Sequence, residues 1–336
     1  MKQILAQIKP YLRWFILGGI LFFLVKTLKD RLIEVASVEI DTQGWLMLTG
    51  ALIITICAHV WSGWVWTWII KIFQQPLSTK EGIRVYLLTN IAKYCPGNIW
   101  HFYGRITVVE RKGGSRGAAT LCVLLEPLLM AAAALFIGLT SSGLIWSEDI
   151  DSPISLFVLK IINLITDKLS WLTINVDSQI LLSAISILSL AGLVVVLIGI
   201  HPFIINQLLH RLSRSKNKAD AIAAQAIKLD RYPFIPFLGE IGFVVFRATG
   251  FMLTFMALQS VTWQQIPQLT SAFSFAWLLG LIVPGAPGGL GVFEVTAFSL
   301  LDNTQFPAEI AAVALYRLIS ILAEAIAAGV CWKSNS

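Results

Sequence analysis

Charged residues are scarce in this sequence: Asp, Glu, Lys and Arg together make up 13% of the 336 residues, whereas hydrophobic residues make up 57%. Soluble domains carry about 25% charged residues, so this composition excludes an ordinary soluble fold. Residues 45–70 hold no acidic or basic side chain except His59, and no charged side chain occurs from Ala248 to Phe293. Because a helix needs roughly 20 apolar residues to cross about 30 Å of hydrocarbon, the sequence predicts an all-α integral membrane protein.

Cysteine is also rare, and its placement excludes the usual cysteine-based sites. The four cysteines occur singly, without a CxxC pair, so neither a zinc site nor a disulfide framework is indicated. The four histidines are dispersed as well, and no nucleophile with a matching base stands out. We therefore expect no metal, no cofactor and no catalytic residues, and hence no enzyme.

The net charge of +6 would favour nucleic-acid binding in a soluble protein. Here the basic residues concentrate in short loops, where Lys and Arg determine membrane orientation. Loops 104–116 and 206–233 are basic and are predicted to be cytoplasmic, whereas 146–178 and the turn near 302–309 are acidic and predicted to be external. This orientation makes the chain a multi-pass protein of the cell (inner) membrane with cytoplasmic N- and C-termini and no nucleic-acid partner.

The apolar segments predict six membrane-spanning helices and two segments that do not cross. The spans are expected at 12–29, 45–70, 117–145, 179–205, 234–259 and 309–332. In 82–104 and 268–301, short apolar stretches flank Pro96–Gly97 and Pro284–Gly285. Proline interrupts a helix, glycine permits a reversal, and each apolar half is too short to cross alone. We predict two re-entrant hairpins at these turns; the alternative is that Pro-Gly merely kinks ordinary spans.

The two halves of the single predicted domain, about 1–146 and 179–336, have the same order of elements. Each has two spans, a hairpin and a third span, and the external segment 147–178 joins them. Because the hairpins are expected to enter from opposite sides, the second half is the first turned upside down. Inverted repeats with broken helices that meet near the midplane are a transporter architecture.

Three motifs accompany this pattern: KYCPGNIWHFYGR at 93–105, PGAPGGLGVFE at 284–294 and LYRL at 315–318. In this order they resemble the transmembrane, flippase-type domain of the lysylphosphatidylglycerol synthase family, over nearly the whole chain. Cys95, where the family has an apolar residue, is a mild departure. The resemblance implies lipid translocation between leaflets. In the full synthases a separate soluble domain transfers an aminoacyl group to phosphatidylglycerol, and we expect this chain to be a stand-alone form without it.

The glycine-rich turn at 285–291 superficially resembles a phosphate loop. It lacks the Gly-Lys-Ser/Thr sequence and the preceding strand of a nucleotide site, so a tight turn with close helix packing is predicted instead. A helix that begins after this turn would also present free N–H groups, which favour a phosphate or a carboxylate.

Charged side chains inside the predicted spans and hairpins are the remaining candidates, because each costs roughly 2.5–3.5 kcal/mol to insert. One hypothesis is structural ion pairing, for example of Arg247 with Glu126 or of Arg317 with Glu294. The other is a cavity in which arginines face a lipid phosphate and glutamates face an amine or a proton. The candidates for such a headgroup cavity are Asn98, Arg105, Glu126, Glu240, Arg247, Gly288, Gly289, Glu294, Arg317 and Glu324.

Some of these polar side chains have a plainer explanation. Lys93 and Arg105 could extend to the cytoplasmic surface, although Arg105 is the better phosphate ligand because its planar fork binds oxyanions through two hydrogen bonds. His59 is expected to be a packed, hydrogen-bonded residue rather than a ligand.

Three functions compete at this point. A lipid flippase or transporter would use a headgroup cavity between the hairpins, and without an ATPase motif its transport would be facilitated or ion-coupled. A membrane-embedded lipid-modifying enzyme would need a nucleophile or metal cluster. A non-transporting scaffold for a lipid-modifying enzyme would not need charges at mid-depth. We favour the flippase, with a phospholipid or lipid-linked substrate as its partner in the membrane; a second copy of the chain and a separate lipid-modifying enzyme stay open as further partners.

Overall fold

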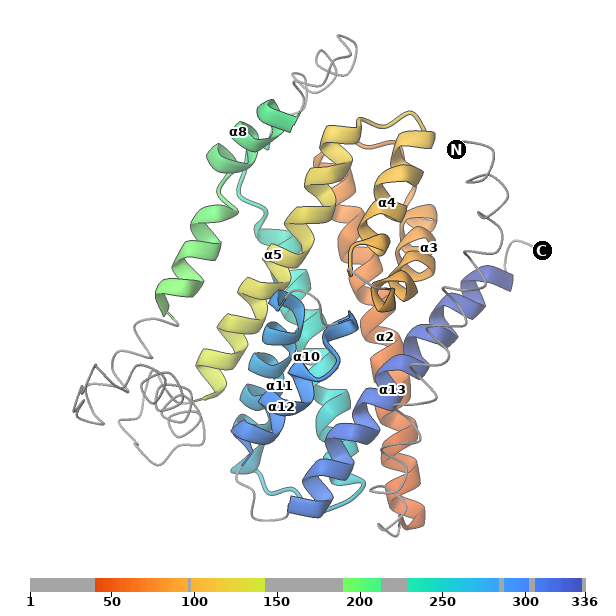
Figure 1. Ribbon diagram of the computed structural model, residues 1–336, viewed down its shortest axis with the longest axis vertical. Coiled ribbons are helices and arrows are strands. Elements are labelled where there is room, and N and C mark those ends of the chain that lie inside the picture. Colours follow the sequence, from red (N-terminus) through yellow and green to blue (C-terminus); the bar gives the residue numbers. More distant parts are fainter. Residues whose placement is uncertain are drawn as a thin grey trace, which may run out of the picture.

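The computed structural model describes residues 40–95, 98–142, 190–212, 229–283, 287–301 and 306–333. All regular secondary structure within these ranges is helical (Figure 1). The predicted first span at 12–29 and the predicted external segment 147–178 lie outside the described residues. So do the four turn residues predicted to reverse the hairpins, Pro96, Gly97, Pro284 and Gly285.

Four of the predicted spans are confirmed as long apolar helices, and the chain is a multi-pass membrane protein. They are α2 (Thr42–Ile72), α5 (Arg116–Ser141), α10 (Phe234–Met256) and α13 (Phe306–Lys333). Each has 18 or more residues and is apolar enough to cross a bilayer. These four helices form the frame in which the rest of the described chain sits.

The predicted span at 179–205 is bent in its described part. Residues 190–199 and the start of α8 (Pro202–Leu212) meet at 56°. Pro202 explains the bend, because it has no N–H to continue the preceding helix and its ring clashes with the carbonyl four residues earlier. This segment packs against α5 and stands at the edge of the helix assembly (Figure 1).

Glycines let α2 and α10 pack closely along their length. A Cβ atom at Gly239 would lie 2.7 Å from Val65 and 2.8 Å from Trp68, and one at Gly250 would lie 2.6 Å from the Thr55 hydroxyl. The Trp61 indole N–H also donates to the Gly239 carbonyl at 2.7 Å. Small residues and buried hydrogen bonds hold helices together in lipid, where no hydrophobic force drives them together.

Each Pro-Gly segment consists of two short helices rather than one continuous helix. The first contains α3 (Thr79–Asn90), the 3-10 turn η1 (Ile91–Tyr94) and α4 (Trp100–Arg111); the second contains α11 (Gln265–Ile282), the 3-10 turn η2 (Pro287–Gly289) and α12 (Val292–Leu300). Within each segment the two helices pack together, and η1 contacts η2. Figure 1 shows α3 and α4 toward the upper end of the assembly and α11 and α12 toward the lower end.

The glycine-rich turn requires backbone conformations that other residues adopt poorly. Gly288, Gly289 and Gly291 all have positive φ angles, of 59°, 74° and 85°. Gly289 also packs directly on the backbone of α11: a Cβ atom there would lie 2.9 Å from the Gly280 carbonyl oxygen. The expectation of a tight, closely packed turn is therefore confirmed for its described residues.

Gly289→Ala is expected to destabilise the fold more than Gly291→Ala does. Both alanines bear the cost of a positive φ angle, of about 1–3 kcal/mol. Only the alanine at 289 also clashes, since a Cβ atom at Gly291 would meet nothing within 4 Å. The clash should lower the free energy of unfolding by about a further 1–3 kcal/mol, measured by denaturant unfolding in detergent. Equal losses in the two variants would contradict the close contact with α11.

An exposed ion pair joins the start of α3 to the end of α4. Ser78 and Glu81 form a capping box at the start of α3, and Lys112 Nζ donates to Glu81 Oε1 at 2.6 Å. The Lys112 hydrogen bond, followed by those from Ser78, lowers the pKa of Glu81 from 4.5 to about 2. The pair therefore favours the ionised carboxylate in the folded protein.

The stabilisation from Glu81 should disappear in acid. A carboxyl group whose pKa is lowered by folding stabilises the protein above its unfolded pKa, and the effect is lost as pH falls from about 4.5 toward about 2. Wild type should therefore melt slightly above Glu81→Gln at neutral pH, by a small margin because the pair is exposed. Thermal unfolding in detergent should show this margin vanish near pH 2; a margin independent of pH would contradict the assignment.

Candidate functional site: a polar cavity where the broken helices meet

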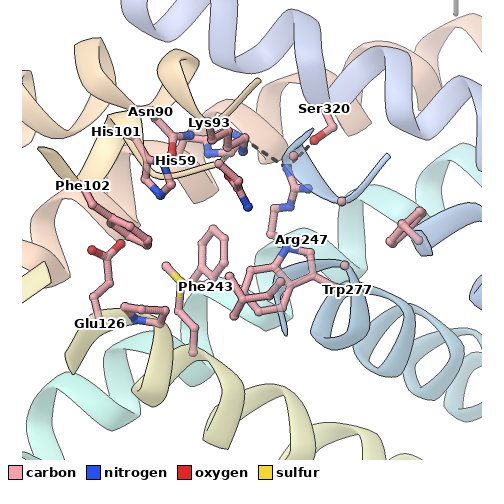
Figure 2. Close-up of a pocket in the computed structure, with 18 of the residues that line it drawn as sticks. His59, Asn90, Lys93, His101, Phe102, Glu126, Phe243, Arg247, Trp277 and Ser320 are labelled. Carbon is pink, nitrogen blue, oxygen red and sulfur yellow. Dashed lines mark hydrogen bonds between the residues drawn. The ribbon is translucent and has the colours of Figure 1, made fainter. Parts of the chain in front are cut away.

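A cavity of about 320 Å³ lies where the two broken segments meet. Every helix of the four-span frame contributes to its wall, as do both broken segments (Figure 2). Its wall includes four basic side chains: Lys93, Arg105, Arg247 and Arg317. Charged side chains buried inside a membrane protein are costly, so the partners of each of these cations determine what the cavity can bind.

Arg105 on α4 is paired with Glu126 on α5. Its Nη1 atom donates to Glu126 Oε2 at 2.5 Å, and its Nε atom donates to the Thr89 hydroxyl at 3.2 Å. The guanidinium also stacks 3.8 Å from the centre of the Tyr86 ring. Only 1% of Arg105 is exposed, so the alternative that this side chain extends to the cytoplasmic surface is wrong.

Arg317 on α13 is paired with Glu294 on α12, and this predicted ion pair is confirmed. Arg317 Nε donates to Glu294 Oε1 at 3.0 Å, while its Nη2 atom donates to the Gly288 carbonyl at 2.8 Å. The other oxygen of Glu294 accepts from the Gly291 N–H at 2.7 Å. Glu294 thus caps its own helix and neutralises Arg317, although it does not itself line the cavity.

Lys93 on η1 is paired with Glu324 on α13, at 2.6 Å. The same oxygen of Glu324 lies 3.4 Å from His59 Nε2. Glu324 is therefore a buried counterion behind the wall rather than part of the lining. The alternative that Lys93 extends to the surface is also wrong, because its amine contacts a carboxylate buried within the helix assembly.

Arg247 on α10 differs from the other three cations. The predicted pairing of Arg247 with Glu126 is wrong, because Glu126 is taken by Arg105. Arg247 Nη1 instead donates to the Ser320 hydroxyl at 2.8 Å and lies 3.1 Å from His59 Nε2; Figure 2 shows its side chain extending toward Ser320. Within the described ranges no carboxylate oxygen lies within 4.0 Å of it, yet it is only 3% exposed.

The remaining predicted residues divide between the wall and the interior. Asn98, Gly288 and Gly289 line the cavity together with Glu126. Asn98 has a positive φ of 50°, and its side-chain oxygen is buried without a hydrogen bond to any described residue. Glu240 does not line the cavity and is fully buried within α10. The cavity thus gathers seven of the ten predicted residues: Asn98, Arg105, Glu126, Arg247, Gly288, Gly289 and Arg317.

The comparison with known families assigns the chain. Residues 12–328 match the family described as lysylphosphatidylglycerol synthase TM region. The chain belongs to this family. The match extends over nearly the whole sequence and confirms the resemblance that the three motifs indicated, whereas comparison with curated proteins gave no match.

Four further residues of the cavity wall were not among the predicted site residues: Ser320, His59, Phe243 and Trp277. Ser320 lies three residues after Arg317 on α13, a spacing that places both on one helix face, so it could have been found. The prediction that His59 is packed and hydrogen-bonded is confirmed, because it is buried and its Nε2 lies 3.1 Å from Arg247 Nη1; it also lines the cavity. Phe243 and Trp277 also line it, with ring centres 5.5 Å apart, and nothing distinguishes them in sequence from ordinary apolar residues.

The side chains of the cavity wall indicate which kind of group it can bind. In the part of the chain that the structure describes, no group of three or more His, Cys, Asp or Glu side chains is placed to hold a metal ion. The lining instead combines cations, hydrogen-bond donors and aromatic faces, which suits an anionic group attached to an apolar one.

Proposed function

We propose that this chain is a lipid flippase that moves a phospholipid or lipid-linked headgroup between the two leaflets through the polar cavity. The observation that carries the proposal is Arg247, a buried guanidinium in the cavity wall with no carboxylate beside it among the described residues. A buried cation of this kind is costly unless an anion joins it. The phosphate of a headgroup supplies such an anion.

The charge balance of the cavity supports an anionic or zwitterionic ligand. Glu126, Glu294 and Glu324 each contact one of the other cations directly. Among the described residues Arg247 has no carboxylate in contact, and Glu324 acts on it only from beyond 4.0 Å. The Ser320 hydroxyl lies at the same place and could donate to a phosphate oxygen. A volume of about 320 Å³ suits a headgroup, while the acyl chains stay in the lipid.

The contacts between helices support the inverted repeat proposed for such a transporter. If α2, α3, α4 and α5 are exchanged for α10, α11, α12 and α13, the pattern of packing is preserved. For example, α13 packs against α2 and α3. The exchange turns these contacts into packing of α5 against α10 and α11, which is also present. We therefore propose that α3–α4 and α11–α12 are re-entrant hairpins that enter from opposite sides, the first from the cytoplasm.

The two ion pairs follow the same exchange. Arg105 and Glu126 join α4 to α5, and Glu294 and Arg317 join α12 to α13, with the signs of the charges reversed. Each pair therefore ties the second helix of a proposed hairpin to the following span. A matched pair on each side would let either hairpin open while the other stays closed, as alternating access requires.

The proposal is tested by reconstitution into liposomes that contain labelled lipids differing only in their headgroups. Wild-type protein should accelerate the exchange of at least one phosphate-bearing lipid between leaflets relative to protein-free vesicles. A label on a neutral diacylglycerol serves as the control for general disturbance of the bilayer. Failure to accelerate any phosphate-bearing lipid, by protein shown to be folded, would overturn the proposal and favour a scaffold.

A further inference from the structure

We infer that Glu240 is a proton-binding site that couples lipid movement to protons through the Arg105–Glu126 pair. The inference rests on the proposed function, because it names the ion that accompanies the lipid. It starts from the position of Glu240 within α10, where the residue is 0% exposed. Neither of its carboxyl oxygens has a hydrogen-bond partner among the described residues.

Glu240 and Glu126 are two buried carboxyl groups that share a single arginine, Arg105. Glu240 interacts electrostatically with Glu126, Arg105 and Tyr86, while Arg105 already contacts Glu126 at 2.5 Å. One guanidinium cannot neutralise two buried carboxylates, and an unpaired anion in a low-dielectric interior is avoided by binding a proton. Glu240 and Glu126 therefore share one proton, which sits on Glu240 while Arg105 holds Glu126 ionised.

The other helices around Glu240 supply no further counterion. Tyr86 on α3 donates to or accepts from the Ser62 hydroxyl of α2 at 2.6 Å. No residue of α11 carries an acidic or basic side chain. The other charged groups near the cavity contact different partners. His59 of α2 and Lys93 of η1 face Glu324, and Arg317 of α13 faces Glu294. Arg247, on α10 itself, contacts Ser320 and His59. The charge on Glu240 thus depends on what Arg105 contacts.

This arrangement links the proton to the ligand. Arg105 and Glu126 line the cavity, whereas Glu240 lies behind it. When a lipid phosphate draws Arg105 away from Glu126, the two glutamates lose their shared cation, and a second proton binds to them. When the phosphate leaves and Arg105 returns to Glu126, that proton is released. If uptake and release face opposite sides of the membrane, each lipid crosses with one proton.

The protonated state of Glu240 can be measured without any transport. The infrared spectrum of the purified protein at neutral pH should contain the C=O stretch of a protonated carboxyl group that is absent from Glu240→Gln. Glu126→Gln should also lack this band, because Arg105 then stabilises ionised Glu240. Absence of the band from wild type, or its persistence in Glu126→Gln, would overturn the proton site.

Coupling is tested in the liposome assay with an imposed pH gradient. One pH unit is a tenfold ratio of protons, so it should change the wild-type rate by up to about tenfold. The double variant Glu240→Gln/Glu126→Gln, which leaves neither carboxyl group to take up the proton, should lose this dependence, whereas Glu81→Gln, which alters an exposed glutamate, should keep it. A wild-type translocation rate that does not change with the gradient would overturn the coupling but not the flippase function. Absence of translocation under any gradient would instead contradict the flippase function.

Discussion

Arg247→Gln is expected to slow translocation of a phosphate-bearing lipid by about 10- to 100-fold while the protein stays folded. Glutamine is polar, but it lacks the positive charge and is too short to reach the Ser320 hydroxyl, which Arg247 Nη1 contacts at 2.8 Å. Hydrogen bonds to charged groups contribute about 1.5–3 kcal/mol, and each 1.4 kcal/mol is about a factor of ten. Stability should change little or rise, because the variant removes a buried charge that has no carboxylate beside it in the described chain.

The matched control for this variant is Arg116→Gln, which removes an exposed arginine at the start of α5. It should translocate lipid at the wild-type rate. Arg247→Lys separates charge from geometry, since lysine restores the charge without the planar fork. Recovery by lysine would indicate that charge suffices, and a rate near that of Arg247→Gln would indicate a two-point contact. A wild-type rate in folded Arg247→Gln would remove this residue from the mechanism.

Arg317→Leu is expected to lower the free energy of unfolding by about 3–5 kcal/mol, because it leaves Glu294 as a buried carboxylate without its cation. It also deprives the Gly288 carbonyl of its donor. The double variant Arg317→Leu/Glu294→Leu should recover much of this loss, since no buried charge is then left unpaired. Denaturant unfolding in detergent of the two single variants and the double variant gives the coupling free energy.

The exposed Lys112–Glu81 pair is the control for this cycle. Its side chains are 52% and 44% exposed, against 8% for both Arg317 and Glu294. Solvent screens such a pair, so its coupling should be close to zero. Additive losses for Arg317 and Glu294, as for the exposed pair, would show that these two residues contribute independently to the turn.

The long spans were predictable because their signal is local. An uninterrupted apolar run of about 20 residues has few alternatives to a membrane helix, and α2, α5, α10 and α13 all agree with the sequence. The bend at Pro202 was missed, since the apolar run of 179–205 continues through it. A proline inside such a run indicates a break in the helix.

Ion pairing was less predictable, because it depends on how each helix is rotated against its neighbours. The Arg317–Glu294 pair was foreseen, whereas Arg247 was wrongly given to Glu126. The sequence indicates which charges are buried. It does not indicate that Arg105 of α4, rather than Arg247, contacts Glu126. The cation left without a carboxylate, on which the proposed function depends, emerges only once the helices are assembled.

The most direct test of the central proposal is whether a lipid headgroup enters the cavity. A photoreactive amino acid at Trp277, in the cavity wall, should crosslink to the headgroup of a phospholipid in native membranes, as mass spectrometry of the adduct would show. The same amino acid at Val245, an exposed residue of α10, should crosslink only to acyl chains. A headgroup adduct at 277 that disappears in Arg247→Gln is the predicted result. No headgroup adduct at 277 in folded wild-type protein, with normal crosslinking at 245, would contradict a lipid-binding cavity.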